Sequence, residues 1–284
     1  MGCGGVSKPG WTPAAGVCQT QAMKSVRTDT SSQVADSTGR ATALPGKPVA
    51  IRLGLATGLA AVGGLLFFVD LPVAGWFRQH RLPGDLARLV DFSEVFAHGL
   101  GAAVVLGVTV SLDPLLRQVG RLTAARKDVV RLCLAAYAGG LIVDFIKAAV
   151  IRVRPRAWNF SEVGSAFDTF GMAAAEMLPG ASAGEGVLRK SVELMSFPSG
   201  HAAVAAGLAT ALAWKYPHGR FVFILLAACA GLQRVVSSAH YPSDVACGAA
   251  IGVAAAAVCL GGARPSAGMA ALPSGRPMVP VGPT

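Results

Sequence analysis

Three short segments of this 284-residue chain place basic and imidazole side chains at the ends of long apolar stretches. They are residues 147–155 (KAAVIRVRP), residues 198–201 (PSGH) and residues 234–244 (RVVSSAHYPSD). Charged groups beside membrane-type segments are costly and usually functional. These residue types suit a phosphate ester, which needs cations to balance its oxygens and an in-line nucleophile held by a partner.

The cations are Lys147, Arg154 and Arg234. Lys147 and Arg154 are seven residues apart, which is two helical turns, so both can point toward one anion. Ser199 and Gly200 are expected to open a helix, where backbone N–H groups and the helix dipole favour an anion. The sequence therefore predicts a phosphate site built from these five residues.

Two histidines and one carboxylate complete the predicted chemistry. Asp244 follows His240 by four residues, in the expected first turn of the last long helix, and could accept the N–H of one ring nitrogen. The other nitrogen would then keep its lone pair for attack on phosphorus. His201, at the start of another helix, is the expected general acid for the leaving alkoxide.

Each of these residues also has an ordinary explanation. Lys147 and Arg154 could reach toward the membrane surface from a helix end, Ser199 could merely cap a helix, and His240 could lie in an interfacial loop. All of these explanations would have to hold at one membrane face and with these spacings. We therefore favour a shared site.

The three segments together resemble the signature of the type 2 phosphatidic acid phosphatase family, which shares its active site with vanadium haloperoxidases. Lys147, six residues and Arg154-Pro155 resemble the first motif, and PSGH resembles the second. Arg234, five residues, His240, three residues and Asp244 resemble the third. The resemblance covers about residues 50–262, and three ordered motifs are far more specific than one.

This resemblance implies a nucleophile at His240, a partner at Asp244 and an acid at His201. It implies phosphate binding by five residues: Lys147, Arg154, Ser199, Gly200 and Arg234. It implies neither a cofactor nor a metal ion. One position departs from the family pattern, because Gln233 stands where Ser usually precedes the Arg of the third motif. That difference affects the expected substrate fit more than the chemical step.

Two further pairs allow more than one interpretation. Arg152 and Arg156 flank the first motif and could contact a second phosphate or lipid headgroups, or could simply be interfacial charges. Glu94 and His98 are four residues apart and could bind a metal ion. No third or fourth ligand lies nearby in the sequence, so a pair satisfied by other protein groups is the favoured interpretation.

Composition indicates the elements that position these residues. The chain is 53% hydrophobic and only 14% charged, which is typical of a membrane protein. We expect an all-α fold, a six-transmembrane-helix bundle, with spans at about 51–69, 92–112, 129–151, 198–214, 221–236 and 244–262. Two faces of small residues, Gly54/Gly58 and Gly248/Gly252, predict close helix packing.

The domain organisation follows from the same pattern. Residues 1–50 and 263–284 are predicted to be disordered tails, and residues 51–262 the membrane phosphatase domain. The long loop 157–197 is mostly small and polar with Trp158, Phe160, Phe167 and Phe170, and could cover the site or dip into the interface.

Charge distribution predicts the orientation. The net charge is +10, but the basic residues are spread between apolar segments, which argues against a nucleic-acid partner. Six spans place both termini and the five basic residues of loop 117–131 on one side, which the positive-inside rule makes cytoplasmic. We expect an integral membrane protein of a bacterial-type plasma (inner) membrane, with the site on its external face.

The predicted function is metal-independent hydrolysis of a lipid phosphate or polyprenyl diphosphate through a phosphohistidine. The expected partners are the lipid substrate and the bilayer, and the sequence does not indicate an oligomeric state. A lipid phosphotransferase with the same site is one alternative, and a non-catalytic lipid-phosphate binder or transporter is another. Binding alone needs no oriented nucleophile and acid, so the enzyme is favoured.

Overall fold

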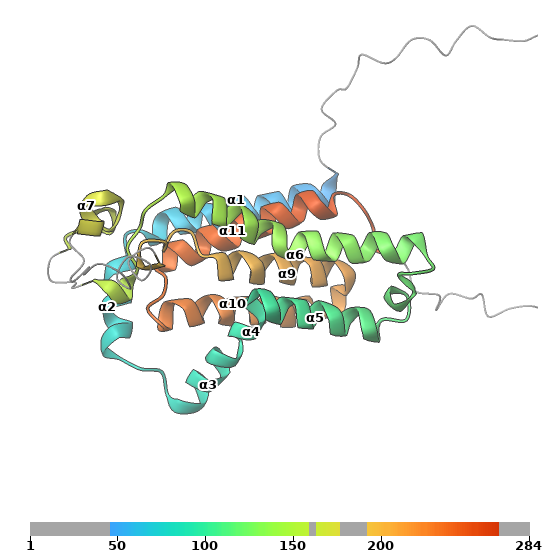
Figure 1. Cartoon of the computed structure of the whole chain (residues 1–284), viewed down its shortest axis with the longest axis horizontal. Coiled ribbons are helices and arrows are strands. Elements are labelled where there is room, and N and C mark those ends of the chain that lie inside the picture. Colours follow the sequence, from blue (N-terminus) through green and yellow to red (C-terminus); the bar gives the residue numbers. More distant parts are fainter. Residues whose placement is uncertain (1–45, 159–162, 177–191, 267–284) are drawn as a thin grey trace, which may run out of the picture. The chain divides into compact units, whose positions relative to one another are not determined.

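The computed structural model describes residues 46–158, 163–176 and 192–266. Within these residues the fold is all-α, as predicted: no strand forms, and bridge pairing is limited to isolated bridges at Arg152. Six helices run along the length of the bundle (Figure 1): α1 (Lys47–Leu66), α5 (Gly99–Leu112), α6 (Thr123–Ala149), α9 (Gly200–Lys215), α10 (Arg220–Val236) and α11 (Pro242–Leu260). The shorter elements are α2 (Asp70–Gln79), α3 (Gly84–Phe92), α4 (Glu94–Ala97), η1 (Leu116–Gln118), η2 (Pro155–Ala157), η4 (Ala166–Thr169), α7 (Gly171–Glu176) and η5 (Pro217–Gly219).

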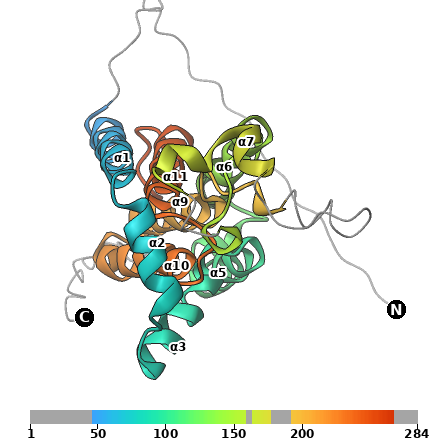
Figure 2. The same cartoon turned by 90° about the vertical axis from the view of Figure 1, so that its left-hand side faces the viewer.

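Helix α9 lies at the centre of the bundle, against α6, α10 and α11 (Figure 2). Its residues are mostly Ala and Gly, which allow neighbouring backbones to approach closely. A Cβ added at Gly248 would lie 2.2 Å from the Ser199 carbonyl oxygen, and one at Gly252 would lie 2.2 Å from that of Ala203. The predicted close packing at Gly248/Gly252 is therefore confirmed, and it joins α11 to α9.

The same prediction for Gly54/Gly58 is wrong. A Cβ added at either glycine would have no heavy atom within 4 Å, and both glycines are exposed. Helix α1 instead packs on α11 through a different face, which includes the buried Ala56 and Gly63. Spacing alone could not tell which face of α1 turns toward its neighbour.

Large apolar side chains cover the outside of this bundle while small ones fill its centre. Exposed examples lie on four of the long helices: Leu55 and Leu65 on α1, Val104 on α5, Phe145 on α6, and Phe221 and Leu225 on α10. Lipid tails are as apolar as these side chains, so no free energy is lost by leaving them outside. Together with the apolar length of the helices, this arrangement is that of an integral membrane protein.

Four helical stretches are long and apolar enough to span a membrane: residues Lys47–Leu66, Thr123–Ala149, Pro217–Val236 and Pro242–Leu260. A fifth span results if the pair Gly84–Ala97 and Gly99–Leu112, bent by 76°, counts as one. The predicted span 198–214 is the 16-residue helix α9, about 24 Å long, which is short of a ~30 Å hydrocarbon core. Six full-length spans are therefore not established.

Element boundaries differ from the sequence prediction in informative ways. Helix α1 begins at Lys47, within the stretch expected to be a tail, and the second predicted span is broken at His98, whose backbone is extended. The predicted tails lie outside the described residues for 1–45 and 267–284, as do 159–162 and 177–191 of the predicted covering loop. At the other end, Ser266 donates its backbone N–H to Asp128 at 2.8 Å.

Candidate active site

Four helix ends meet at one end of the bundle: α6 and α10 end there, and α9 and α11 begin there (left side of Figure 1). Contacts join the three predicted segments at this end. The Ser199 N–H donates to the Asp244 backbone carbonyl at 3.0 Å, and Arg154 Nη1 donates to the Ala239 carbonyl at 3.3 Å. A Cβ added at Gly200 would lie 3.5 Å from Lys147 Nζ. Segments about 50 residues apart in sequence thus share one location.

His240 lies in the tight connection between α10 and α11. The turn uses a left-handed backbone at Ser238, with φ of 53°, and the His240 N–H donates to the Arg234 carbonyl at 3.0 Å. The imidazole is buried, with 2% of its side chain exposed. Burial lowers the pKa of His240 to about 4, against the opposing effect of Asp244, so the ring is neutral at pH 7.

The ring orientation of His240 is set by Ser196. Its Nδ1 lies 2.7 Å from the Ser196 backbone carbonyl oxygen, which can only accept, so this nitrogen carries the proton. In the neutral ring the lone pair is then on Nε2. Ser196 was not singled out in the sequence, because a backbone carbonyl carries no residue-type signal.

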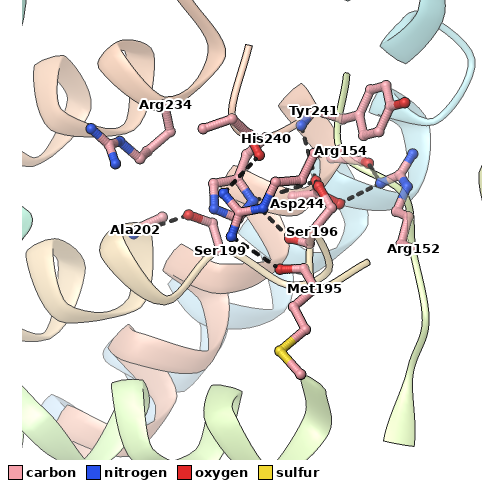
Figure 3. Close-up of polar contacts among 12 residues, drawn as sticks. Arg152, Arg154, Met195, Ser196, Ser199, Ala202, Arg234, His240, Tyr241 and Asp244 are labelled. Carbon is pink, nitrogen blue, oxygen red and sulfur yellow. Dashed lines mark hydrogen bonds and ion pairs between the residues drawn. The ribbon is translucent and has the colours of Figure 1, made fainter. Parts of the chain in front are cut away.

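Asp244 lies in the first turn of α11, as predicted, but it does not directly hydrogen-bond His240. The distance from its Oδ2 to His240 Nδ1 is 3.6 Å, which is long for a hydrogen bond. Oδ2 instead accepts from Ser196 Oγ at 2.6 Å and from the Tyr241 N–H at 2.9 Å, while Oδ1 accepts from Arg152. Ser196 therefore links carboxylate and imidazole, with its hydroxyl on one and its carbonyl on the other (Figure 3).

Two of the predicted phosphate cations, Lys147 and Arg154, are not ion-paired with any carboxylate among the described residues. Lys147, on the last turns of α6, approaches Gly200 at the start of α9, and Arg154 donates to the carbonyls of Val192 at 3.0 Å and Met195 at 3.4 Å. Within the described parts of the chain neither cation forms an ion pair within 4.0 Å. Burial lowers the pKa of Arg154, which marks the cost of placing this charge there.

The start of α9 supplies the other predicted phosphate ligands. Ser199 is the N-cap residue: its Oγ accepts the Ala202 N–H at 3.4 Å, and its side chain is buried. The ordinary capping role considered from the sequence is thus present. Gly200 and His201 follow, and the first N–H groups of a helix have no partner within the helix itself.

The third predicted cation, Arg234, is paired with a carboxylate. Its Nη2 lies 2.6 Å from Glu94 Oε1, and its Nε donates to Gln233 Oε1 at 2.6 Å. Gln233 in turn donates to Glu94 Oε2 at 3.3 Å and to Asp91 Oδ1 at 3.4 Å. The residue that departs from the family pattern therefore ties Arg234 to the segment that carries Glu94.

His201 lies beside the same carboxylate. Its Nε2 is 4.0 Å from Glu94 Oε1, and its ring is 5.9 Å from that of His98 in an edge-on arrangement. Glu94 and His98 thus face protein groups, as the favoured sequence interpretation held. In the described residues no three His, Cys, Asp or Glu side chains are grouped to hold a metal ion.

Arg152 differs most from its prediction, because its side chain is fully buried and can reach neither lipid headgroups nor solvent. It forms ion pairs with Asp244 and, at 2.6 Å, with Asp70 Oδ2 of α2. Asp70 is also fully buried. The sequence offered one signal for it: an acidic residue directly after a charge-free apolar span. Arg156, by contrast, is partly exposed and pairs with Glu193 at 2.9 Å.

Comparison with known proteins identifies this region. Residues 128–264 match the model of the PAP2 superfamily, a range that includes all three motifs. Two curated relatives are Lipid A 1-phosphatase of Rhizobium johnstonii, 35% identical over 113 residues, and Lipid A 1-phosphatase of Rhizobium etli, 34% identical over 113 residues. These alignments cover 40% of this chain and about two-fifths of the relatives, 38% and 40% of their lengths.

One solved structure is also similar, that of Aquifex aeolicus LpxE, with a TM-score of 0.44 and 23% sequence identity. The similarity covers 68% of this chain and 94% of that chain. The matched family model, the relatives and the three ordered motifs agree with one another. Residues 128–264 of this chain thus carry both the match to the PAP2 superfamily and all three motifs of the type 2 phosphatidic acid phosphatases.

Proposed function

We propose that this protein is an integral membrane lipid phosphatase that acts through a phosphohistidine at His240. The observation that carries the proposal is the geometry of this imidazole: it is buried, and its Nδ1 is held by the Ser196 carbonyl. Burial also lowers its pKa, which favours the neutral ring. A nucleophilic nitrogen needs a free lone pair and a fixed direction, and both follow from that hydrogen bond. The family and the named activity of the relatives support the same reaction class.

In the first step, His240 Nε2 forms a bond to phosphorus while the bond from phosphorus to the lipid oxygen breaks. We assign the proton for the leaving oxygen to His201. Burial lowers the pKa of this ring to about 3, so His201 takes up the proton only when the bound phosphate offsets the nearby cations. Lys147, Arg154 and the N-terminal amides of α9, at Ser199 and Gly200, balance the charge on the phosphoryl oxygens. Arg234 joins them when the phosphate competes with Glu94, its partner at 2.6 Å.

In the second step, a water molecule attacks phosphorus and the P–N bond breaks, with the electron pair returning to His240. His201 accepts the proton of the water, which restores the starting enzyme. Because protein cations already balance the phosphate, the reaction as proposed needs no metal ion. We place the site on the external face of the inner membrane, because the basic residues of segment 117–131 favour the cytoplasmic side for the other end of the bundle.

The substrate class is a phosphorylated lipid whose headgroup reaches the end of the bundle. Purified protein should release inorganic phosphate from one or more of lipid A, phosphatidic acid and undecaprenyl diphosphate, with lipid A first because of the relatives' names. Release should persist in excess EDTA, and loss that added Mg²⁺ restores would overturn metal independence. Transfer of phosphate to an added acceptor lipid in place of water would identify a phosphotransferase instead.

A further inference from the structure

We propose that Arg152 and Asp70 are positioning residues that hold Asp244, and through Ser196 the nucleophile His240, in place. The proposal rests on the proposed function. Neither residue is one of the phosphate ligands or catalytic groups that the three motifs predict. Asp70 belongs to α2, which lies outside the region 128–264 that matches the family model.

Arg152 is the centre of a buried charged network. Besides its two carboxylate partners, Nη1 donates to Ser243 Oγ at 2.8 Å and Nε donates to Thr169 Oγ1 at 3.0 Å. The side chains of Arg152, Asp70 and Asp244 are all 0% exposed. Burying such charges is costly unless partners satisfy them, and removing one partner leaves the others uncompensated.

Asp70 ties the start of α11 to α2. Its Oδ1 accepts the Ser243 N–H at 3.0 Å, and its Oδ2 accepts from the Ser243 hydroxyl and from Arg152 Nη2. Ser243 immediately precedes Asp244, so Asp70 fixes the first turn of the helix that carries the catalytic carboxylate. Burial raises the pKa of Asp70, against the opposing effects of Arg152 and Ser243, which shows how costly this carboxylate is to keep there.

Aromatic rings enclose the guanidinium of Arg152. Its central carbon lies 4.1 Å from the ring centroid of Tyr241, 4.6 Å from that of Phe170 and 5.0 Å from that of Phe67. These rings exclude water and restrict the guanidinium plane, and a cation over an aromatic face is attracted to it. The fork can therefore present its donors to Asp70 and Asp244 in one orientation.

The order of contacts gives the network its direction. Arg152 binds Asp244 Oδ1, Asp244 Oδ2 accepts from Ser196 Oγ, and the Ser196 carbonyl accepts from His240 Nδ1. Figure 3 shows this sequence from Arg152 on one side to His240 in the middle, with Arg234 on the far side. Loss of Arg152 or Asp70 should thus loosen the imidazole without removing any group that touches the phosphate.

The test measures kcat and KM for phosphate release by the full-length protein in detergent. Asp70→Asn and Arg152→Gln should lower kcat by about 10- to 100-fold, a typical cost of removing groups that orient a functional ligand, while KM stays near its wild-type value. Arg152→Lys keeps the charge but not the fork, so it should recover part of the loss seen in Arg152→Gln. If the two residues served only folding, kcat per folded protein would not fall while KM stayed constant, and Arg152→Lys would not recover kcat relative to Arg152→Gln.

Asp128→Asn is the matched control, because Asp128 is a buried carboxylate in an ion pair with Lys215, 3.3 Å, at the other end of the bundle. It should lower thermal stability but leave kcat per folded protein unchanged. If Asp70→Asn and Arg152→Gln also keep kcat per folded protein, or raise KM alone, the positioning proposal is overturned.

A milder variant tests the network if Asp70→Asn or Arg152→Gln fails to fold. Ser243→Ala removes one hydroxyl from the network and should lower kcat several-fold, whereas an unchanged kcat would contradict the proposal. If the wild-type protein releases phosphate and His240→Ala does not, the proposed function stands whatever the positioning variants do. Wild-type protein without any phosphate release would overturn both proposals together.

Discussion

At the scale of single residues, the nucleophile candidate is oriented by a backbone carbonyl and not by a carboxylate directly. Ser196 accepts from His240 through its carbonyl and donates to Asp244 through its hydroxyl, at 2.7 and 2.6 Å. A carbonyl cannot become protonated in the range of working pH, so it fixes one tautomer of the ring. The carboxylate then acts one contact further away, on the position of Ser196.

The protonation state of His240 is testable by NMR of protein labelled with ¹⁵N-histidine, with its resonance assigned by loss in His240→Gln. Burial lowers the pKa to about 4, so we expect a midpoint near that value and a neutral ring at pH 7. The unfolded-state value is about 6.5. Because the pKa of His240 is lower in the folded than in the unfolded state, its contribution to folding stability is fully present at pH values above about 6.5. This contribution is lost as the pH falls through about 4. A midpoint at or above 6.5 would contradict the buried, neutral nucleophile.

At the scale of elements, the close approach of α9 and α11 brings Ser199 and Asp244 together. Their contact depends on the absence of a side chain at Gly248, where a Cβ would lie 2.2 Å from the Ser199 oxygen. The atom it would meet is backbone, so the two helices would have to separate. The start of α9, where His201 lies, would then move away from His240.

Gly248→Ala should therefore lower both the melting temperature and kcat in detergent. Gly58→Ala is the control, because an added Cβ there meets no atom within 4 Å and a helix interior favours Ala over Gly by roughly 0.5–1 kcal/mol. Thermal unfolding and phosphate release are the two measurements. Equal behaviour of the two variants would show that the close contact at Gly248 does not position the site.

Sequence alone predicted the elements that carry strong local signals. Long charge-free apolar runs predicted the positions of α1 and α11, and Asp244 lies in the first turn of α11 as expected. The break at His98 was missed because the apolar pattern continues through it. The short helix α2 was missed because residues 70–79 have no clear period, and with it the role of Asp70.

The site was predictable where residue types are diagnostic and not where the partner is distant. Lys147, Arg154 and the histidines lie together as the motifs indicated. Glu94 pairs with Arg234 and accepts a hydrogen bond from Gln233, which is 139 residues away in the chain. Both contacts depend on the packing of α4 against α10. The alternatives for Arg152 stayed open because its two carboxylate partners lie about 80 and 90 positions away in the chain.

At the scale of the whole molecule, the bundle fits a bilayer because large apolar side chains lie outside and small ones inside. The distribution of basic residues sets the proposed orientation. The site end of the bundle should face outward, since the segment 117–131, which includes the first turns of α6, is strongly basic and lies at the opposite end. A lipid headgroup at the outer interface could then enter without its charge crossing the hydrocarbon core.

Cysteine labelling in intact cells tests that orientation. In a background without the six native cysteines, Ser237→Cys at the site end should react with an impermeant thiol reagent, and Thr123→Cys at the other end should not. Both positions are exposed, so burial does not decide the outcome. After permeabilisation both should react. The reverse pattern in intact cells would place the site on the cytoplasmic side.

If His240 is the nucleophile, it becomes phosphorylated during turnover. The measurement is single-turnover labelling with a ³²P-lipid phosphate followed by an alkaline quench, since phosphohistidine survives alkali and is lost in acid. His218→Ala is the matched control, because His218 is exposed at the other end of the bundle. Phosphorylation site mapping then identifies the labelled residue.

Wild-type protein and His218→Ala should both carry an acid-labile label at His240 and release phosphate at similar rates. His240→Ala should fold, carry no label and release no phosphate, because it lacks the only imidazole that the Ser196 carbonyl and Asp244 hold in this way among the described residues. Phosphate release by His240→Ala near the wild-type rate, or turnover by wild-type protein with the label on another residue, would contradict the account.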